Sequence, residues 1–281
     1  MVPWVRSVSA GLFMAAAGPF PQAPATVVDC LSTSRPKARW MLPAAMTEVS
    51  GLALTDDGRL FLHNDERGVV MALDAATGRT VGTYQLGAIP PSGDFEGIAV
   101  AGGALVLTTS SGVLYAMDLP AKGAPDGILS FTATPTGLGT QCEVEGLSYD
   151  RTDRVLLLAC KSPRKKKLRN QVAVFRWDLA TGALARPDRV VFDEVALGNR
   201  RSQGFHPSAL EVDPGSGQWV MLASAEKSVA AVDRSGRVLA TAPLGKHHHH
   251  PEGLALGADG SAYVSDEGGR GPGTVTVYAC R

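Results

Sequence analysis

Glu143-Val144-Glu145-Gly146-Leu147 is one of five similar motifs that recur along the chain. The other four copies are Glu48-Val49-Ser50-Gly51-Leu52, Asp94-Phe95-Glu96-Gly97-Ile98, His206-Pro207-Ser208-Ala209-Leu210 and His250-Pro251-Glu252-Gly253-Leu254. Their fourth positions, 51, 97, 146, 209 and 253, are separated by 46, 49, 63 and 44 residues. Repeats of this length are typical of propellers and solenoids, in which each repeat forms one structural unit.

Each motif begins a series of short apolar runs that are separated by turn residues such as Asp56-Asp57-Gly58. A third run ends on an aspartate in four copies, and a fourth run follows, for example Thr80–Leu86. The second runs are Leu60–His63, Leu105–Thr109, Val155–Cys160, Trp219–Ala223 and Ala262–Ser265. This pattern predicts an all-β fold, a single β-propeller of five four-stranded blades. The alternative is six blades, one of them degenerate.

The two ends of the chain complement each other in this fold. The fifth copy stops at Tyr278-Ala279, after its third strand, and the apolar run Ala38–Leu42 precedes the first motif without a partner. We expect this N-terminal strand to close the last blade, because its pairing would remove an exposed sheet edge.

Residues 1–25 are expected to be a signal peptide, followed by one propeller domain over residues 26–281. Arg6 supplies a positive charge, Val8–Ala17 a short apolar stretch and Ala23-Pro24-Ala25 a small-residue cleavage site. No later stretch reaches the roughly 20 apolar residues of a membrane span. We therefore expect an exported protein, periplasmic or extracellular, without a transmembrane segment; an ordinary disordered N-terminus is the alternative.

The four cysteines are predicted to form two disulfides, as suits an oxidising compartment. Cys30 and Cys280 lie at the two chain ends that share the closing blade. Cys142 precedes the first strand of the third blade and Cys160 ends the second, so antiparallel pairing would bring them within bridging distance. Four free thiols in a cytosolic protein are the alternative.

The composition of the 281 residues excludes some classes of function. Lys and Arg number 27, as do Asp and Glu, so the formal net charge is zero. A non-specific nucleic-acid binder is normally strongly basic, so we expect no nucleic-acid partner. We expect instead a monomer that binds a small-molecule or peptide ligand.

Acidic residues gather in the segments that open on one rim of the central channel, namely those before each first strand and after each second strand. Eleven of the 27 acidic residues fall there. They are Glu48, Asp65, Glu66, Asp94, Glu96, Glu143, Glu145, Glu226, Glu252, Asp266 and Glu267. Like charges that converge in this way repel unless a cation or basic groups compensate them.

This concentration predicts a calcium site, because Ca²⁺ accepts six to eight oxygen ligands. The predicted metal ligands are Glu48, Asn64, Asp65, Glu66, Glu96, Glu145, Glu252, Asp266 and Glu267. The residues predicted to line the surrounding ligand funnel are His63, Asp94, Glu143, Lys161, His206 and Glu226. In the alternative interpretation, each Glu-Gly motif is a turn element whose carboxylate accepts backbone N–H groups.

Two other stretches could bind ions. The run His247–His250 contains imidazoles that suit transition metals, but four adjacent histidines cannot all point at one ion. The basic stretch Lys161–Arg169 lengthens the third repeat by about ten residues. It is interpreted either as a solvated loop or as a cationic flap beside the funnel. The chain has no nucleophile elbow, H-E-x-x-H motif or P-loop.

The five motifs, together with Asp65-Glu66-Arg67-Gly68, Asp266-Glu267-Gly268 and Cys160-Lys161, resemble the SdiA-regulated family of exported bacterial β-propellers. A looser resemblance, through Pro251-Glu252-Gly253-Leu254 and Asp259–Asp266, is to calcium-dependent propeller phytases and to gluconolactonase and NHL-repeat propellers. The fourth copy departs from the pattern, because His206-Pro207-Ser208-Ala209 has neither Glu nor Gly.

We therefore expect an exported propeller that binds a divalent cation, calcium, and a ligand at an acidic funnel; no motif demonstrates catalysis, and whether the protein is an enzyme stays open. A calcium-dependent hydrolase of phosphate esters or lactones is the first alternative, since the cation would polarise the substrate. A protein-interaction scaffold is the second.

Overall fold

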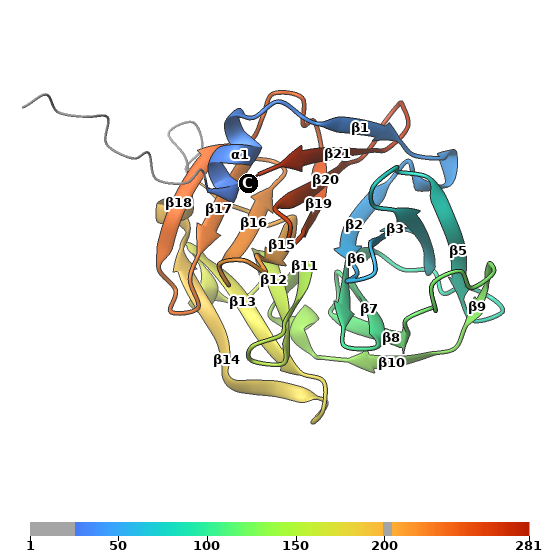
Figure 1. Ribbon diagram of the computed structural model, residues 1–281. Coiled ribbons are helices and arrows are strands. Elements are labelled where there is room, and N and C mark those ends of the chain that lie inside the picture. The colour runs from blue at the N-terminus through green and yellow to red at the C-terminus, as the bar shows by residue number, and fades with distance from the viewer. Residues whose placement is uncertain (1–25, 199–203, 281) are drawn as a thin grey trace, which may run out of the picture.

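Five antiparallel sheets are arranged around a common axis in the computed structural model, which describes residues 26–198 and 204–280 (Figure 1). The sheets correspond one to one with the five sequence motifs, so the predicted five-bladed propeller is confirmed. The predicted signal peptide, residues 1–25, lies outside the described residues. None of the helices among the described residues is long and apolar enough to cross a membrane.

Each blade takes its innermost strand from the segment that begins with a motif. Blade 1 contains β2 (Val49–Leu54), β3 (Arg59–Asn64), β4 (Val69–Asp74) and β5 (Thr80–Leu86), and blade 2 contains β6 (Phe95–Ala101), β7 (Ala104–Thr109), β8 (Val113–Asp118) and β10 (Phe131–Pro135). Blade 3 contains β11 (Cys142–Asp150), β12 (Val155–Pro163), β13 (Gln171–Asp178) and β14 (Ala183–Asp193), and blade 4 contains β15 (Ala209–Val212), β16 (Trp219–Ala223), β17 (Ser228–Val232) and β18 (Val238–Pro243). Blade 5 contains β19 (Pro251–Leu256), β20 (Ser261–Asp266), β21 (Thr274–Ala279) and β1 (Ala38–Met41).

Two details of the blades differ from the prediction. Blade 1 has a fifth strand, β9 (Gly127–Leu129), which pairs in parallel with the outer strand β5. Strand β12 continues past Cys160, where the sequence suggested a loop, and pairs Pro163 with Cys142. The lysines after it lie in a 3₁₀ turn, η3 (Lys166–Leu168), whose last residue is buried in the core and holds the turn against the blade.

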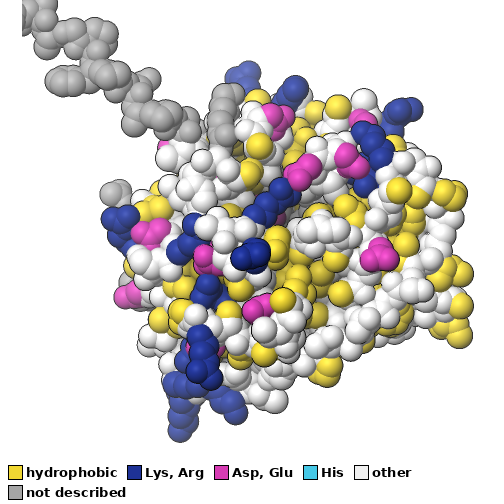
Figure 2. Space-filling view, turned by 60° about the horizontal axis from the view of Figure 1, so that its bottom comes forward, with side chains coloured by type: hydrophobic (Ala, Val, Ile, Leu, Met, Phe, Trp, Pro, Cys, Tyr) yellow, Lys and Arg dark blue, Asp and Glu magenta, His cyan; other side chains and the backbone are white. Residues whose placement is uncertain are grey.

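The hydrophobic core is divided among the gaps between blades. Five clusters of buried apolar side chains occur, one between each pair of neighbouring blades, including one between blades 5 and 1. On the face shown in Figure 2, basic and acidic side chains are interspersed, and hydrophobic side chains show between them. Because each buried cluster lies between two blades, contacts between neighbouring sheets hold the interior of the propeller together.

Blade 5 joins the two ends of the chain. Strand β1 pairs with β21 in antiparallel register, from Ala38 opposite Val277 to Met41 opposite Thr274, which is the position predicted for the N-terminal strand. Before it lies a helix that the sequence reading missed, α1 (Val27–Thr33), which begins at a capping box formed by Thr26 and Asp29. The other short helices are η1 (Ala44–Met46), η2 (Leu138–Thr140) and α2 (Glu194–Leu197).

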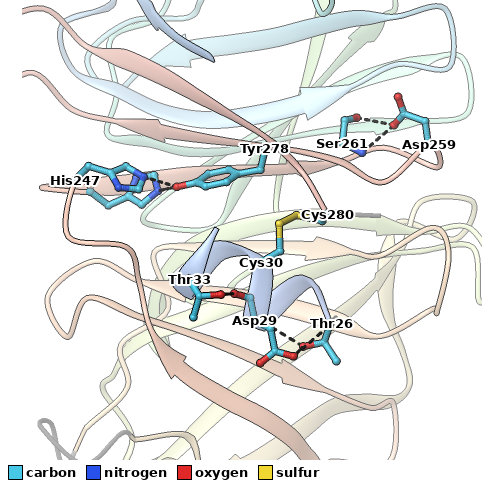
Figure 3. The surroundings of a disulfide bond; sticks show 10 residues. Thr26, Asp29, Cys30, Thr33, His247, Asp259, Ser261, Tyr278 and Cys280 are labelled. Carbon is cyan, nitrogen blue, oxygen red and sulfur yellow. Dashed lines mark hydrogen bonds between the residues drawn. A yellow bond between two sulfur atoms is a disulfide. The ribbon is translucent and has the colours of Figure 1, made fainter. Parts of the chain in front are cut away.

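The disulfide predicted between the chain ends is present. Cys30 of α1 is bonded to Cys280, with 5.3 Å between their Cα atoms (Figure 3). The helix buries Val28 and Leu31 in the cluster between blades 4 and 5. The disulfide, the helix and the β1–β21 pairing thus all close the ring at the same place.

The second predicted disulfide was wrong, because Cys142 and Cys160 are free and buried. The strands that carry them are shifted in register, so that Cys142 lies opposite Pro163 and Cys160 opposite Val144. Both thiols lie in the core between blades 2 and 3. A hydrogen bond with Cys142, together with burial, raises the pKa of the Cys160 thiol, which favours the neutral form.

The motif glycines allow the innermost strands of neighbouring blades to touch, and we predict that Gly146→Ala is strongly destabilising. An added Cβ at Gly146 would lie 2.8 Å from the backbone nitrogen of Leu210, which belongs to the next blade and cannot move aside cheaply. We expect a loss of about 3 kcal/mol in the free energy of unfolding, measured by urea denaturation. Gly103→Ala is the matched control, because nothing lies within 4 Å of its added Cβ. Equal stability of the two variants would contradict the prediction.

Candidate functional site

In four of the five blades the sequence motif forms a β-bulge at the start of the innermost strand. In four blades the register against the second strand shifts within the motif, between Val49 and Gly51, Phe95 and Gly97, Val144 and Leu147, and Pro251 and Gly253. The residues that the bulges leave unpaired include Ser50, Glu96, Glu145 and Glu252. A bulge re-aims the side chain of the extra residue. The bulge therefore sets the direction in which the recurring glutamate side chain points.

Three of these glutamates interact with further acidic side chains in a closed circuit, which we call the acidic mouth. The members of the acidic mouth are Asp65, Asp94, Glu96, Glu145, Glu252 and Glu267. Each interacts electrostatically with at least one other member, and the chain of interactions returns from Glu267 to Asp65. Blade 4 contributes no carboxylate to the circuit, because its copy of the motif has no glutamate.

Burial and mutual repulsion make these carboxyl groups unusually weak acids. Burial, followed by the charges of Glu145 and Asp94, raises the pKa of Glu96 to about 10. Burial and the nearby carboxylates of Glu252 and Asp65 raise the pKa of Glu267 to about 7. The pKa of Glu252 is also raised by burial, against a hydrogen bond from Ser224. In the absence of a cation, the mouth therefore retains protons at neutral pH.

Lys227 acts electrostatically on Glu252, and Lys161 compensates part of the charge through a direct bond. Its Nζ donates a hydrogen bond to Glu145 Oε1, and the Glu145 side chain is only 2% exposed. Burial outweighs this bond and raises the pKa of Glu145 to about 8. Two carboxylate oxygens of the mouth, Glu145 Oε2 and Asp65 Oδ1, are buried and accept no hydrogen bond from the described residues. One ammonium group thus leaves the acidic mouth incompletely compensated.

Other residues that the sequence assigned to the site have structural partners. Both oxygens of Asp266 accept hydrogen bonds from the loop before β19, Oδ1 from the backbone nitrogens of His249 and His250 and Oδ2 from His248 Nδ1. Asn64 Oδ1 accepts from the backbone nitrogen of Arg67 at 3.2 Å, within a turn. These two predicted metal ligands therefore hold loops by hydrogen bonds to neighbouring residues.

The funnel residues of blades 1 and 4 also have local partners. In blade 4, His206 and Glu226 pair with each other, with 2.6 Å between Nδ1 and Oε1. His63 is fully buried, and burial lowers its pKa to about 4, so its ring is neutral. Its Nε2 lies against Gly51 and has no hydrogen-bond partner among the described residues. His63 therefore lies behind the mouth rather than in it.

The remaining predicted residues lie at the rim of the acidic mouth. Glu48 and Glu66 are exposed, and their backbone carbonyls accept hydrogen bonds from the backbone nitrogens of Asp65 and Gly93. Glu143 is half-buried at the start of β11. Among residues 26–198 and 204–280, no group of three or more His, Cys, Asp or Glu side chains already has an arrangement that could hold a metal ion.

The histidine run is part of the closing-blade packing. The Tyr278 hydroxyl lies 2.6 Å from His248 Nε2 and also contacts His247, next to the Cys30–Cys280 disulfide (Figure 3). Both ring nitrogens of His248 are thereby occupied, since its Nδ1 bonds Asp266. His249 and His250 are exposed. Sequence reasoning did not foresee the role of Ser224, the first residue after β16, which bonds Glu252 across the blade boundary.

The fold and the acidic mouth together define a five-bladed propeller with a carboxylate-lined channel opening. The sequence profile of the SdiA-regulated family matches residues 33–270, and the chain belongs to this family. No curated protein sequence matches the chain.

Solved structures similar to the chain share its fold at low sequence identity. Glutaminyl cyclase from Myxococcus xanthus has a TM-score of 0.57 and 16% identity, over 86% of this chain and 94% of that one. The PQQ-bound aldose sugar dehydrogenase from Streptomyces coelicolor has a TM-score of 0.53 and 14% identity, over 87% and 99%. A luciferin-regenerating enzyme has a TM-score of 0.52 and 9% identity, over 83% and 91%. At these identities the likeness shows the propeller architecture.

Proposed function

We propose that this protein is an exported propeller that binds a divalent cation, calcium, together with a small-molecule or peptide ligand, at the acidic mouth. The observation that carries the proposal is Glu145, a buried carboxylate with one oxygen bonded to Lys161 and the other without a partner among the described residues. An unpaired buried charge is costly unless a proton or a cation neutralises it. A calcium ion would supply the charge that Lys161 alone does not.

The donor chemistry of the acidic mouth fits calcium better than a transition metal. Glu96, Glu145 and Glu252 offer carboxylate oxygens, which Ca²⁺ prefers, and it accepts six to eight of them with water completing the set. Glu96 and Glu145, whose pKa values are raised to about 10 and about 8, hold protons at neutral pH when no ion is bound. We therefore propose that binding exchanges protons for the ion and gathers these side chains around it.

Export is part of the same proposal. The disulfide between Cys30 and Cys280 supports folding in an oxidising compartment, the periplasm or the extracellular space, because such bonds are rare in the cytosol. Extracellular calcium is also abundant enough for a site of modest affinity.

The test of this function is calcium binding by the acidic-mouth variant Glu145→Gln/Glu252→Gln. We expect calcium to raise the melting temperature of the wild type by several degrees over that in a chelator. In isothermal calorimetry, the double variant should bind calcium at least tenfold more weakly, because two of the three proposed ligands lose their charge. Asp118→Asn, an exposed carboxylate at the end of β8, is the matched control and should bind as the wild type does. A wild type that binds no calcium at millimolar concentration would contradict the proposal.

A further inference from the structure

The channel opens a second time on the face opposite the acidic mouth, into a cavity of about 1130 Å³. Its walls are the turns between the first and second strands, including residues 54–58, 149–152, 211–214 and 256–261. The mouth residues lie at the other ends of the same strands, so the two openings are separate. A volume of this size is sufficient for a drug-sized organic ligand.

One position in the wall of this cavity differs between blades. Two residues after the motif Gly or Ala, four blades have a small residue and blade 4 has glutamate. The five residues at this position are Ala53, Ala99, Ser148, Glu211 and Ala255. Symmetry of the repeat predicts a small residue there, and the structural role of the blade does not require a carboxylate. This departure could be found in the sequence by aligning the five motifs one position further.

Glu211 lies half-buried in the cavity wall, where the charge of Arg151 acts on it. Its Oε1 accepts hydrogen bonds from Ser148 Oγ and from the backbone nitrogen of Val212, both at 3.2 Å, whereas Oε2 accepts none from the described residues. No described residue forms a salt bridge with it. Burial raises its pKa to about 8, against the effects of the Ser148 hydrogen bond and of Arg151. A bound cation would stabilise the ionised form of a carboxyl group that has a raised pKa and no salt bridge.

Other acidic residues of the cavity are already paired or cap turns. Asp56 binds both terminal nitrogens of Arg151, and Asp150 binds Arg234 through two hydrogen bonds and also accepts one from Trp219 Nε1. The lining has seven acidic and four basic side chains, so its net charge favours a cation. Glu211 is the acidic side chain of this set that is left for a ligand.

We propose that this cavity is a binding site for a small organic cation, whose ammonium group bonds to Glu211 and whose apolar body packs on Leu54, Val100 and Tyr149. These three side chains are half-buried and line the same cavity as Glu211. Apolar side chains that hold the body of a ligand, together with a charged group at a fixed point, give both affinity and orientation. The site is independent of calcium binding at the acidic mouth.

The experiment uses 2-phenylethylamine as a probe and 2-phenylethanol as its neutral counterpart, with the mature protein in a chelator. Isothermal calorimetry or ligand-observed NMR should show binding of the amine by the wild type. The alcohol should bind at least tenfold more weakly, since it cannot form the ion pair. Glu211→Gln should weaken amine binding at least tenfold and leave calcium binding at the mouth unchanged.

Two further variants separate the proposal from its alternatives. Val100→Trp should weaken amine binding while Glu211 remains, because the indole would take the space proposed for the apolar body of the amine; it also serves if Glu211→Gln folds poorly. Glu145→Gln/Glu252→Gln should bind the amine as the wild type does. Equal binding of amine and alcohol, no amine binding by the wild type, or loss of amine binding in the mouth variant instead of in Glu211→Gln would overturn the proposal.

Discussion

Replacing Cys30 and Cys280 together with alanine is expected to lower the free energy of unfolding by about 5 kcal/mol. The two cysteines are 250 residues apart, so their bond closes nearly the whole described chain into one loop. In the chain-entropy description, the stabilisation rises with loop length, because the cross-link removes conformations from the unfolded state. The bond also holds α1 on the seam between blades 4 and 5, where Leu31 is fully buried.

The measurement is guanidinium unfolding of the wild type and of Cys30→Ala/Cys280→Ala. Cys142→Ala/Cys160→Ala is the control: it removes the two free thiols from the core without changing any cross-link, and should cost only what two small cavities cost. A reducing agent should reproduce the loss in the wild type and have no effect on the first variant. A loss below about 1 kcal/mol would show that the β1–β21 pairing alone closes the ring, contrary to the prediction.

The blades could be predicted from the sequence because each is a local unit with its own repeat. Strands β5 and β16 were predicted to the residue, since turn residues bound their apolar runs clearly. Strand β9 could not be, because it pairs with a strand about 40 residues earlier and has only three residues of its own. The helix α1 was not predicted, although Thr26 and Asp29 have the spacing of a capping box. It has only seven residues and directly follows the expected signal peptide.

The acidic residues of the site illustrate a second limit of prediction from sequence. A sequence shows how many carboxylates meet at one rim, but not which oxygens the backbone already occupies. Asp266 and Asp65 follow equivalent second strands, yet both oxygens of Asp266 are bonded to the histidine loop, whereas Asp65 Oδ1 has no hydrogen-bond partner among the described residues. The difference arises from the loop 247–250, whose conformation depends on Tyr278 in another strand.

The cysteines show that strand order can be predicted more readily than strand register. Cys142 and Cys160 do lie on paired strands of one hairpin, as predicted. Cys160 is opposite Val144, whereas Cys142, two residues earlier, is opposite Pro163, so the two cysteines are diagonal neighbours rather than a directly opposite pair. The sequence predicted the hairpin but not this register.

Through Glu96 and Glu145, the free energy of unfolding is expected to fall by about 4 kcal/mol between pH 7 and pH 9 in a chelator. The folded protein retains protons on Glu96, whose pKa is about 10, and on Glu145, whose pKa is about 8, whereas in the unfolded chain both are ionised above about pH 5. Because the folded state binds more protons in this window, each rise in pH favours unfolding. The pKa of His63 is lowered to about 4, so its own effect is confined to pH values below about 6.5 and does not interfere.

Urea unfolding at several pH values, with and without calcium, measures this slope. Glu96→Gln/Glu145→Gln should remove most of the slope, since a neutral amide replaces each proton-holding carboxyl, and should leave the smaller contributions of Glu211 and Glu267, whose pKa values are about 8 and about 7. Glu66→Gln, an exposed residue of the same rim, should keep the full slope. Calcium at ten millimolar should remove the part of the loss at pH 9 that Glu96 and Glu145 cause, because the ion takes the place of their protons. A constant or rising free energy between pH 7 and pH 9 would contradict the raised pKa values. A slope that calcium leaves unchanged would contradict the calcium site while keeping the proton-holding mouth, so the two parts of the argument can fail separately.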